Sequence, residues 1–349
     1  MSSAFLIFVV SVLGILTAEL FYLAADALVA FVAMLFGASF KSFFRKGLWG
    51  LAAVPLIFAY GSLVERNLYK VKEVEIVSGK VSGSFDGYRI VHISDIHLSS
   101  FAVRHKSLAR AVAKINSLEP DVVLFTGDLI TFTPAEMDGL ENILAGIKAV
   151  DGVYSVLGNH DYCLHHNWGS DSLRLAAVDE IVERERNMGW IPLMNGNVNI
   201  SRGSSDGLFS DMISVIGVEN TSALPQFPSY GDLLKAKAGA EGSFKVLMSH
   251  DPTHWRNEVV RDGDIDLMLS GHTHAMQISF LGWSPSSLIF EEYGGLYERT
   301  LGKVWTGKSC LSDAPQYLYV NTGLGETGFP ARIGVRPEIT LITLRSGKM

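Results

Sequence analysis

Apolar runs that end on polar side chains recur along the middle and C-terminal parts of this chain. The first run covers residues 90–93 and continues into Asp95 and His97. A short apolar run of this kind predicts a buried strand. Side chains two positions apart in an extended chain point the same way, so Asp95 and His97 can converge on one point just beyond the strand. That geometry suits a metal ion.

Four later runs repeat this arrangement. They cover residues 122–126, 153–157, 245–249 and 266–270, and they lead respectively into Asp128, into Asn159 with His160 and Asp161, into His250, and into His272 with His274. Ligands of open α/β sheets collect at the carboxyl ends of strands, so we expect all five strand ends to face one crevice.

Helical and alternating patterns fill the chain between these runs. Apolar residues at helical spacing predict helices over residues 104–118, 135–148 and about 171–188. Further strands are expected at residues 71–77 (a half-buried edge strand), 213–218, 317–320 and 338–344, and a loop or irregular hairpins at 195–211. Strand, helix and strand in this order form a βαβ unit, so the fold class is α/β.

The segment 275–315 directly follows His274 and interleaves aromatic residues with glycine. We expect most of it to pack as covered hairpins. The alternative is a flap that contacts lipid or caps the substrate.

An apolar stretch from residue 4 to residue 40 carries only Glu19 and Asp26 among charged residues. This length exceeds one bilayer crossing, which predicts a tight helical hairpin. A basic loop and a second apolar stretch, residues 47–64, follow. We therefore expect a membrane anchor of two or three segments in residues 1–66 and a catalytic domain in residues 67–349. A cleaved signal peptide is the alternative, and the absence of Lys and Arg from the first residues argues against it.

Basic residues at the two ends of the second apolar stretch bear on its orientation. Lys41, Arg45 and Lys46 place the preceding loop in the cytoplasm by the positive-inside rule, although Arg66, Lys70 and Lys72 at the other end favour the opposite orientation. We expect a multi-pass protein of the cell (inner) membrane with an extracytoplasmic catalytic domain.

The amino-acid composition limits the classes of binding partner and the disulfide content that we expect. The net charge is −7, and no stripe of Lys and Arg follows the strand runs, which argues against a nucleic-acid-binding surface. Cys163 and Cys310 are too few for a disulfide framework. We expect both to be free thiols, with a single disulfide as the alternative.

The polar strand ends supply more ligands than one small cation takes. The candidates, which include no thiolate, are Asp95, His97, Asp128, Asn159, His250, His272 and His274. Two divalent ions of the Mn, Fe, Zn or Co type that share a bridging carboxylate fit this set better. Two such ions form a clamp for in-line displacement at phosphorus and hold a bridging water whose pKa they lower.

In their order and residue types these motifs resemble the calcineurin-like metallophosphoesterases. The family pattern is D-x-H, G-D, G-N-H-[DE], a lone His and G-H-x-H, which stand here as Asp95-Ile96-His97, Gly127-Asp128, Gly158-Asn159-His160-Asp161, His250 and Gly271-His272-Thr273-His274. The apolar N-terminus makes the chain similar to the membrane-anchored bacterial branch. The resemblance implies two stacked mixed β-sheets flanked by helices, here preceded by transmembrane helices.

The resemblance also implies a role for each motif residue. One metal would be held by Asp95, His97 and His274, and the other by Asn159, His250 and His272, with Asp128 bridging. His160 would be a catalytic residue that contacts the phosphate and stabilises or protonates the leaving oxygen. Thr131 and Phe132 stand where the protein phosphatases of this superfamily carry Asp and Arg, which argues against that activity and leaves the carboxylate partner of His160 unidentified.

We therefore expect a metal-dependent phosphoric ester hydrolase in which a metal-bridging hydroxide cleaves a phosphodiester, phosphomonoester or pyrophosphate bond. One alternative is a UDP-2,3-diacylglucosamine-type pyrophosphatase that acts on a lipid A precursor, in which case the phosphoester substrate is lipid-linked. The other is a non-catalytic membrane binding protein. Near the site, we expect His165 and His166 to lie in a solvated loop, and Asp161 either steadies its loop or takes part in the chemistry.

Overall fold

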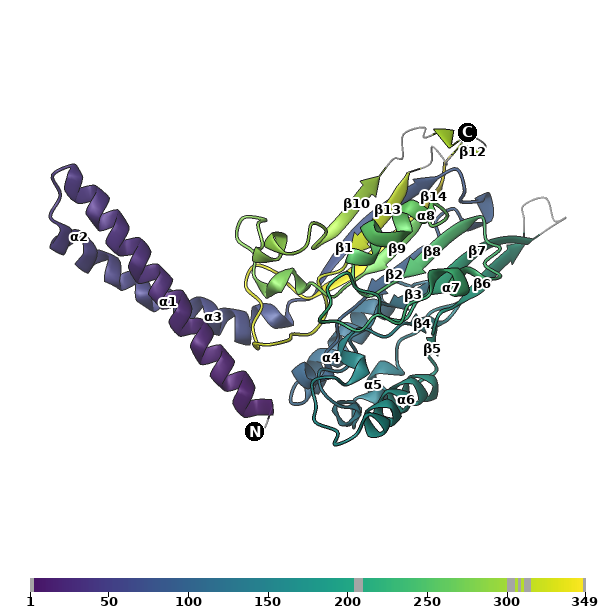
Figure 1. Cartoon of the computed structure of the whole chain (residues 1–349), viewed down its shortest axis with the longest axis horizontal. Coiled ribbons are helices and arrows are strands. Elements are labelled where there is room, and N and C mark those ends of the chain that lie inside the picture. Colours follow the sequence, from purple (N-terminus) through teal and green to yellow (C-terminus); the bar gives the residue numbers. More distant parts are fainter. Residues whose placement is uncertain (1–2, 204–209, 300–304, 307–308, 311–314, 348–349) are drawn as a thin grey trace.

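The computed structural model describes residues 3–203, 210–299, 305–306, 309–310 and 315–347, and its main body is two stacked mixed sheets (Figure 1). The first has the order β1-β14-β2-β3-β4-β5 and the second β10-β13-β9-β8-β7-β6. In the first, the strands are β1 (Lys70–Ser78), β2 (Arg89–Ile93), β3 (Val122–Phe125), β4 (Val153–Ser155), β5 (Ile191–Pro192) and β14 (Glu338–Ser346). In the second, they are β6 (Gly196–Gly203), β7 (Ser210–Gly217), β8 (Phe244–Met248), β9 (Leu267–Ser270), β10 (Gly295–Arg299) and β13 (Gln316–Val320).

Helices cover the outer faces of both sheets (Figure 1). On the first sheet these are α4 (His105–Asn116), α5 (Glu141–Leu144) and α6 (Asp171–Asn187), and on the second α7 (Leu233–Lys237) and α8 (Val260–Asp262). The expected fold of two stacked mixed sheets flanked by helices is confirmed.

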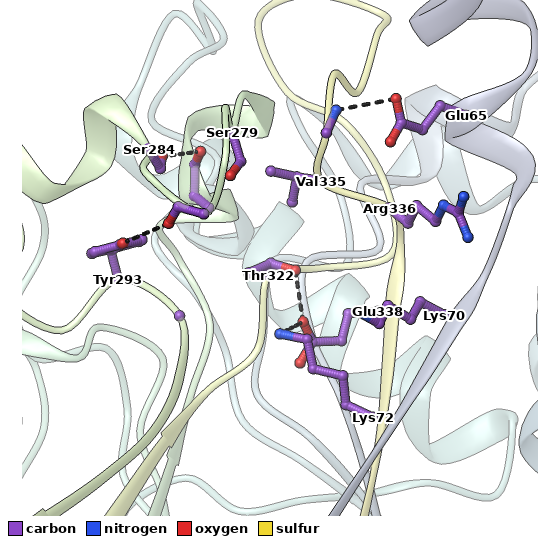
Figure 2. Close-up of a pocket in the computed structure, with 14 residues that line it drawn as sticks. Glu65, Lys70, Lys72, Ser279, Ser284, Tyr293, Thr322, Val335, Arg336 and Glu338 are labelled. Atoms are coloured by element: carbon purple, nitrogen blue, oxygen red, sulfur yellow. Dashed lines mark hydrogen bonds and ion pairs between the residues drawn. The ribbon is translucent and has the colours of Figure 1, made fainter.

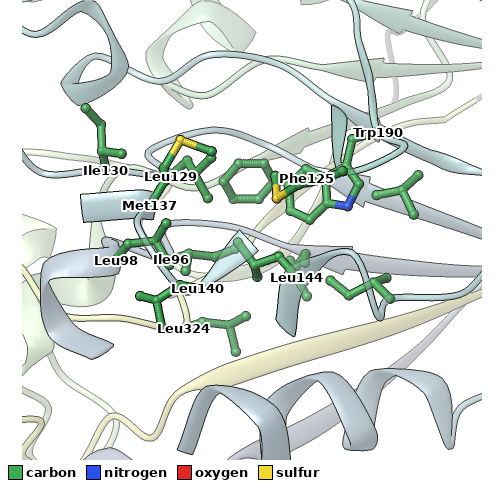
Figure 3. Close-up of a cluster of buried hydrophobic side chains, with 14 of the residues drawn as sticks. Ile96, Leu98, Phe125, Leu129, Ile130, Met137, Leu140, Leu144, Trp190 and Leu324 are labelled. Carbon is green, nitrogen blue, oxygen red and sulfur yellow. The ribbon is translucent and has the colours of Figure 1, made fainter. Parts of the chain in front are cut away.

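Three hydrophobic clusters hold these layers together. Ile90 and Val122 face the opposite sheet, whereas their neighbours Val91 and Val123 face the helices. Strands buried on both faces read as unbroken apolar runs, which explains the sequence pattern. Figure 3 shows the cluster beneath the helices, where Leu140, Leu144 and Trp190 pack with Phe125. This packing fixes the strand ends from which the polar side chains project.

The predicted helix over residues 135–148 is wrong. The chain instead forms a 3-10 turn, Pro134–Met137, and the short helix α5. Glu136 causes part of this break, because its carboxylate accepts hydrogen bonds from the backbone N–H groups of Ser99, Thr131, Phe132 and Thr133. Gly139, with φ of 74°, turns the backbone out of the helical region.

Of the loop or irregular hairpins expected at residues 195–211, the part that the structure describes forms a regular hairpin. β6 and β7 pair there as antiparallel strands. The polar residues that suggested a loop lie within β6, where the side-chain amides of Asn197 and Asn199 donate to the carbonyls of Ala236 and Gly239. The side chains of Asn197 and Asn199 thus connect β6 to α7 and to the residues that follow it.

The N-terminal apolar stretch forms one continuous helix, α1 (Ser3–Leu35), of 33 residues. The expected tight hairpin within residues 4–40 is therefore wrong, since no Gly or Pro interrupts the chain between residues 15 and 35. After Gly37 the chain returns through α2 (Phe40–Gly47), a 3-10 segment (Leu48–Ala52) and α3 (Ala53–Leu63). The stretches Ser11–Leu35 and Phe40–Asn67 are each long and apolar enough to cross a membrane.

A buried acid lies beneath β4. Glu185 of α6 accepts a hydrogen bond from the Ser155 hydroxyl at 2.6 Å, and its second oxygen has no hydrogen-bond partner in the described part of the chain. Burial raises the pKa of Glu185 to about 8, well above the ordinary glutamate value.

We expect Glu185→Gln to remove a loss of stability that occurs as pH rises from about 4.5 to about 8. Unfolded glutamate releases its proton near pH 4.5, whereas the folded group keeps it to about pH 8, so the stability is fully present below pH 4.5 and falls as pH rises to 8. The fall is up to about 1.4 kcal/mol per pH unit. Thermal unfolding at pH 5.5 and pH 8 checks this, and an equal pH dependence in wild type and variant would contradict it.

Candidate metal centre

The polar strand ends of both sheets meet at one edge of the sandwich. Asp95 and His97 follow β2, Asp128 follows β3, and Asn159 with His160 follows β4. From the second sheet, His250 follows β8, and His272 with His274 follows β9. The structure thus brings all eight predicted site residues to one place, and all except His160 and His272 are nearly or fully buried.

The first cluster joins Asp95, His97 and His274. The Nε2 atoms of His97 and His274 lie 3.1 Å apart, and His274 Nε2 is 3.2 Å from Asp95 Oδ1. Two ring nitrogens and a carboxylate oxygen therefore point at one small volume.

The second cluster joins Asp128, His250 and His272. Asp128 Oδ2 lies 3.2 Å from His250 Nε2 and 3.6 Å from His97 Nε2, so one carboxylate oxygen contacts both clusters. Asn159 Oδ1 is buried without a hydrogen-bond partner among the described residues, and the buried His250 Nε2 has only the ion-pair contact with Asp128 there. Orphaned buried acceptors of this kind need an explanation.

A divalent metal would satisfy both atoms. The Nδ1–H of His250 donates to the Thr126 carbonyl at 2.7 Å, which leaves the lone pair on Nε2 free to bind an ion. Carboxylate, imidazole and amide donors suit Mn, Fe, Zn or Co. The residues present fit divalent metal binding.

The charges of the clustered side chains also favour a bound cation. Burial opposes ionisation of Asp128, yet the neighbouring His250 and His160 hold the pKa of its carboxyl well below the usual range. Burial lowers the pKa of His250, but the charge of Asp128 outweighs it and raises that pKa to about 10. The carboxylates thus attract positive charge, and metal binding would release the protons that otherwise supply it.

The backbone at the strand ends is strained. Five non-glycine site residues lie in the left-handed region, with φ of 51° at Asp95, 44° at His97, 58° at Asp128, 70° at His272 and 49° at His274. Each such residue costs on the order of 1–3 kcal/mol and persists only where its surroundings enforce it. The centre is therefore preorganised by the fold.

Two motif glycines leave room for the carboxylates. A Cβ at Gly158 would clash with Asp128 Oδ1, and a Cβ at Gly271 would clash with Asp95 Oδ2. Glycine at these positions allows the loops of β4 and β9 to approach the ligands closely.

Asp161 ties two of the loops together. Its carboxylate accepts hydrogen bonds from the backbone N–H groups of Asp128, Leu129, Ile130 and Gly158, at 2.8 to 3.1 Å. This resolves the two roles open for Asp161 in favour of steadying the loop.

Asp161→Ala is expected to destabilise the domain by at least about 3 kcal/mol, because several buried N–H donors lose their acceptor. Asp138→Ala is the matched control. Asp138 is exposed and pairs with Arg184 on the surface, a contact worth at most about 1 kcal/mol. Urea unfolding of both variants checks the difference, and similar losses would contradict it.

His160 is held by the backbone. Its Nδ1 lies 2.9 Å from the Thr131 carbonyl, which takes the place of the carboxylate that the sequence left unidentified. Its backbone N–H donates to Asp128 Oδ1 at 2.8 Å. His165 and His166 are exposed in the turn that follows His160, so the expected solvated loop is confirmed, and the His165 ring lies 4.6 Å from that of His160.

Arg332 is the site neighbour that sequence reasoning missed. It is fully buried, lies 3.5 Å from His274 Nδ1, and donates to the carbonyls of Thr322 and Gly325. No strand-end motif surrounds it in the sequence, so no local signal indicated it. It positions the loop behind His274.

Comparison with known proteins agrees with this geometry. A family model described as calcineurin-like phosphoesterase matches residues 88–276, more than half of the chain. The chain is 32% identical over 309 residues to a zebrafish (Danio rerio) transmembrane protein with metallophosphoesterase domain, covering 86% of this chain and 63% of that protein. The matched region thus spans less than two thirds of the zebrafish protein.

Two bacterial relatives match over most of their length. The uncharacterized metallophosphoesterase YkuE of Bacillus subtilis is 28% identical, over 87% of this chain and 96% of that protein. The UDP-2,3-diacylglucosamine pyrophosphatase LpxG of Chlamydia muridarum is 26% identical, over 79% of this chain and 89% of that protein. The expected enzyme class, a phosphoric ester hydrolase, is the class that the family name states, and the chain belongs to the calcineurin-like phosphoesterase family.

Proposed function

We propose that this chain hydrolyses phosphoric esters at a centre of two divalent metal ions. The observation that carries the proposal is the position of Asp128, whose Oδ2 contacts histidines of both clusters. One ion would be held by Asp95, His97 and His274, and the other by Asn159, His250 and His272. Asp128 would bridge them.

When bound, the ions would supply positive charge to the phosphoryl oxygens and lower the pKa of the attacking water. Proton donation and the positioning of the reacting groups depend on the chain's own residues. The Thr131 carbonyl accepts from His160 Nδ1–H, so in the imidazolium form the Nε2–H is free to be donated to the leaving oxygen. The buried ligands and the strained strand ends hold this arrangement in place before substrate arrives.

A lipid-linked substrate is the second candidate, of the kind named for the LpxG relative. A cavity of about 410 Å³ begins at His160 and His165 and reaches Arg66, next to the end of α3, past Val103 and Phe329. Val103, Phe132, Phe329 and Pro330 give the cavity apolar walls that suit an acyl chain, and Arg66 with Glu326 adds charge at the end next to the anchor. Comparing turnover of a diacyl pyrophosphate in mixed micelles with that of a water-soluble diester separates the candidates.

We also propose that residues 1–66 anchor the protein as a multi-pass protein of the cell (inner) membrane, with residues 67–349 as an extracytoplasmic catalytic domain. The two apolar stretches and the transmembrane relatives support membrane association. Accessibility of an introduced cysteine after residue 66 to a membrane-impermeant reagent in intact cells tests the sidedness. Labelling only after lysis would overturn it.

The activity itself is tested with the full chain in detergent. After chelation and Mn²⁺ add-back, we expect hydrolysis of bis-p-nitrophenyl phosphate, p-nitrophenyl phosphate or both, and their ratio gives the diester or monoester preference. No turnover of either substrate or of a lipid-linked pyrophosphate, with metal bound, would contradict the proposal and favour a non-catalytic binding protein.

A further inference from the structure

A group of apolar side chains is exposed between β9 and β10. Phe280 is 72% exposed, Leu281 92%, Leu288 78% and Ile289 58%, and Trp283 is also exposed. The expectation that this segment packs as covered hairpins is wrong for these residues, and residues 300–304, 307–308 and 311–314 of the same stretch lie outside the described part. Several large exposed apolar side chains within one short segment indicate an interaction surface.

The backbone conformation of this segment holds these side chains in exposed positions. Phe280 and Trp283 exchange both backbone hydrogen bonds, at 2.8 and 3.0 Å, and enclose Leu281 and Gly282, which have φ of 50° and 86°. Positive φ at both central residues makes a tight hairpin turn, and it is unusual for leucine. The buried Ser284 hydroxyl fastens the base of the segment by donating to the Ala275 carbonyl at 2.6 Å.

This turn lies on the side of the sandwich that faces the N-terminal helices, as the light-green loops between β9 and β10 show in Figure 1. A chain of contacts connects the two. Ser279 N–H donates to the Ile333 carbonyl at 2.8 Å, and the next residue, Gly334, donates to Glu65 just after α3 at 3.1 Å. The exposed apolar residues therefore continue the surface from which the candidate spans leave the domain.

Positive charge lies beside the apolar turn. A cavity of about 570 Å³ separates the turn from the start of β1 and β14, and Lys70 and Arg336 stand exposed at its edge (Figure 2). Lys72 in the same cavity is neutralised by Glu338 at 2.7 Å, whereas Lys70 and Arg336 have no acidic partner among the described residues. Free cations next to apolar side chains complement an anionic bilayer surface.

We propose that residues 280–289 form a membrane-docking loop that inserts into the bilayer interface, with Lys70 and Arg336 at anionic headgroups. This rests on the proposed membrane anchor. Docking has a consequence for the metal centre, because a second apolar cavity, of about 410 Å³, runs from His272 and His274 past Met276 to Ile278 at the start of the loop. The docked domain presents this opening of the centre to the membrane surface.

The test uses the full chain in nanodiscs, with Cys163 and Cys310 replaced by alanine and one introduced cysteine carrying an NBD fluorophore. Leu281→Cys reports on the loop. Leu234→Cys is the matched control, since Leu234 is 81% exposed on α7 of the second sheet. Leu28→Cys on α1 reports on the anchor. Lipids with a nitroxide on the acyl chain quench only labels in contact with the bilayer.

We expect strong quenching at positions 28 and 281 and none at 234. Quenching at 28 without quenching at 281 would overturn the docking loop and leave the anchor intact. Protection of the label at 281 that depends on protein concentration would assign the surface to a second copy of the chain. No quenching at 28 would overturn the anchor and the docking loop together. None of these outcomes depends on the hydrolase activity.

The cations are tested by varying the headgroups. Quenching at 281 is expected to increase when phosphatidylglycerol replaces phosphatidylcholine, and Lys70→Ala with Arg336→Ala should remove this increase. Lys148→Ala, an exposed lysine of the first sheet's helical side, should leave it unchanged. An unchanged increase in the double variant would remove Lys70 and Arg336 from the docking surface.

Discussion

Asp128→Ala is expected to reduce hydrolysis of bis-p-nitrophenyl phosphate to the rate without enzyme and to leave the chain without bound metal. Its carboxylate is the one that contacts both histidine clusters, at 3.2 Å to His250 and 3.6 Å to His97. Without it, each proposed ion would lose a ligand, and the buried histidines lose the negative charge that favours a cation. Metal content by mass spectrometry and turnover after Mn²⁺ add-back measure both effects.

The variant must be shown to fold. Asp128 also accepts the backbone N–H of His160, so some loss of stability is expected, and a circular dichroism spectrum like that of the wild type establishes that the loss of metal is local. Full metal content with full activity in folded Asp128→Ala would show that the bridging assignment is wrong.

His160→Ala is expected to lower kcat by about 10²–10⁴-fold, the range for loss of a general acid, while metal content stays at the wild-type level. His160 is placed by the Thr131 carbonyl and contributes no atom to the proposed ligand set. Steady-state kinetics on p-nitrophenyl phosphate and on a substrate with a poorer leaving group measure the effect. The loss should be larger for the poorer leaving group, which needs the proton more.

His105→Ala is the control for this prediction. His105 is an exposed histidine at the start of α4 whose ring hydrogen-bonds, within the described part of the chain, to the Ala102 carbonyl. It should leave kcat unchanged. If His160→Ala lost its metal, or lowered kcat equally for both leaving groups, His160 would be a structural residue or a ligand and not the proton donor.

The strand ends could be predicted because their signal is local. Asp95 and His97 stand two residues apart after a doubly buried strand, and the same pattern at β3, β4, β8 and β9 places the remaining candidates at one edge of the sandwich. Apolar runs and the polar residues that end them need no knowledge of distant contacts. The α/β fold class and the candidate site both followed from these runs, whereas the two stacked sheets were expected from the family resemblance.

The features that could not be predicted depend on contacts between distant segments. Thr131 supplies a backbone carbonyl to His160, which no side-chain pattern reveals. Arg332 reaches His274 across a long stretch of sequence, and Glu136 breaks an otherwise helical pattern by capping a loop. The exposure of the proposed docking loop could not be predicted either, because the sequence pattern of aromatic residues beside glycine is the same whether the fold buries or exposes them.

The central claim, that this fold assembles two metal positions that share Asp128, is tested most directly by counting metal ions. The full chain in detergent is stripped, reloaded with Mn²⁺ and analysed by mass spectrometry, alongside His272→Ala and His274→Ala, which each remove one ligand from a different cluster. We predict two ions per wild-type chain and one in each variant. A single ion in the wild type, or two retained in both variants, would contradict the account.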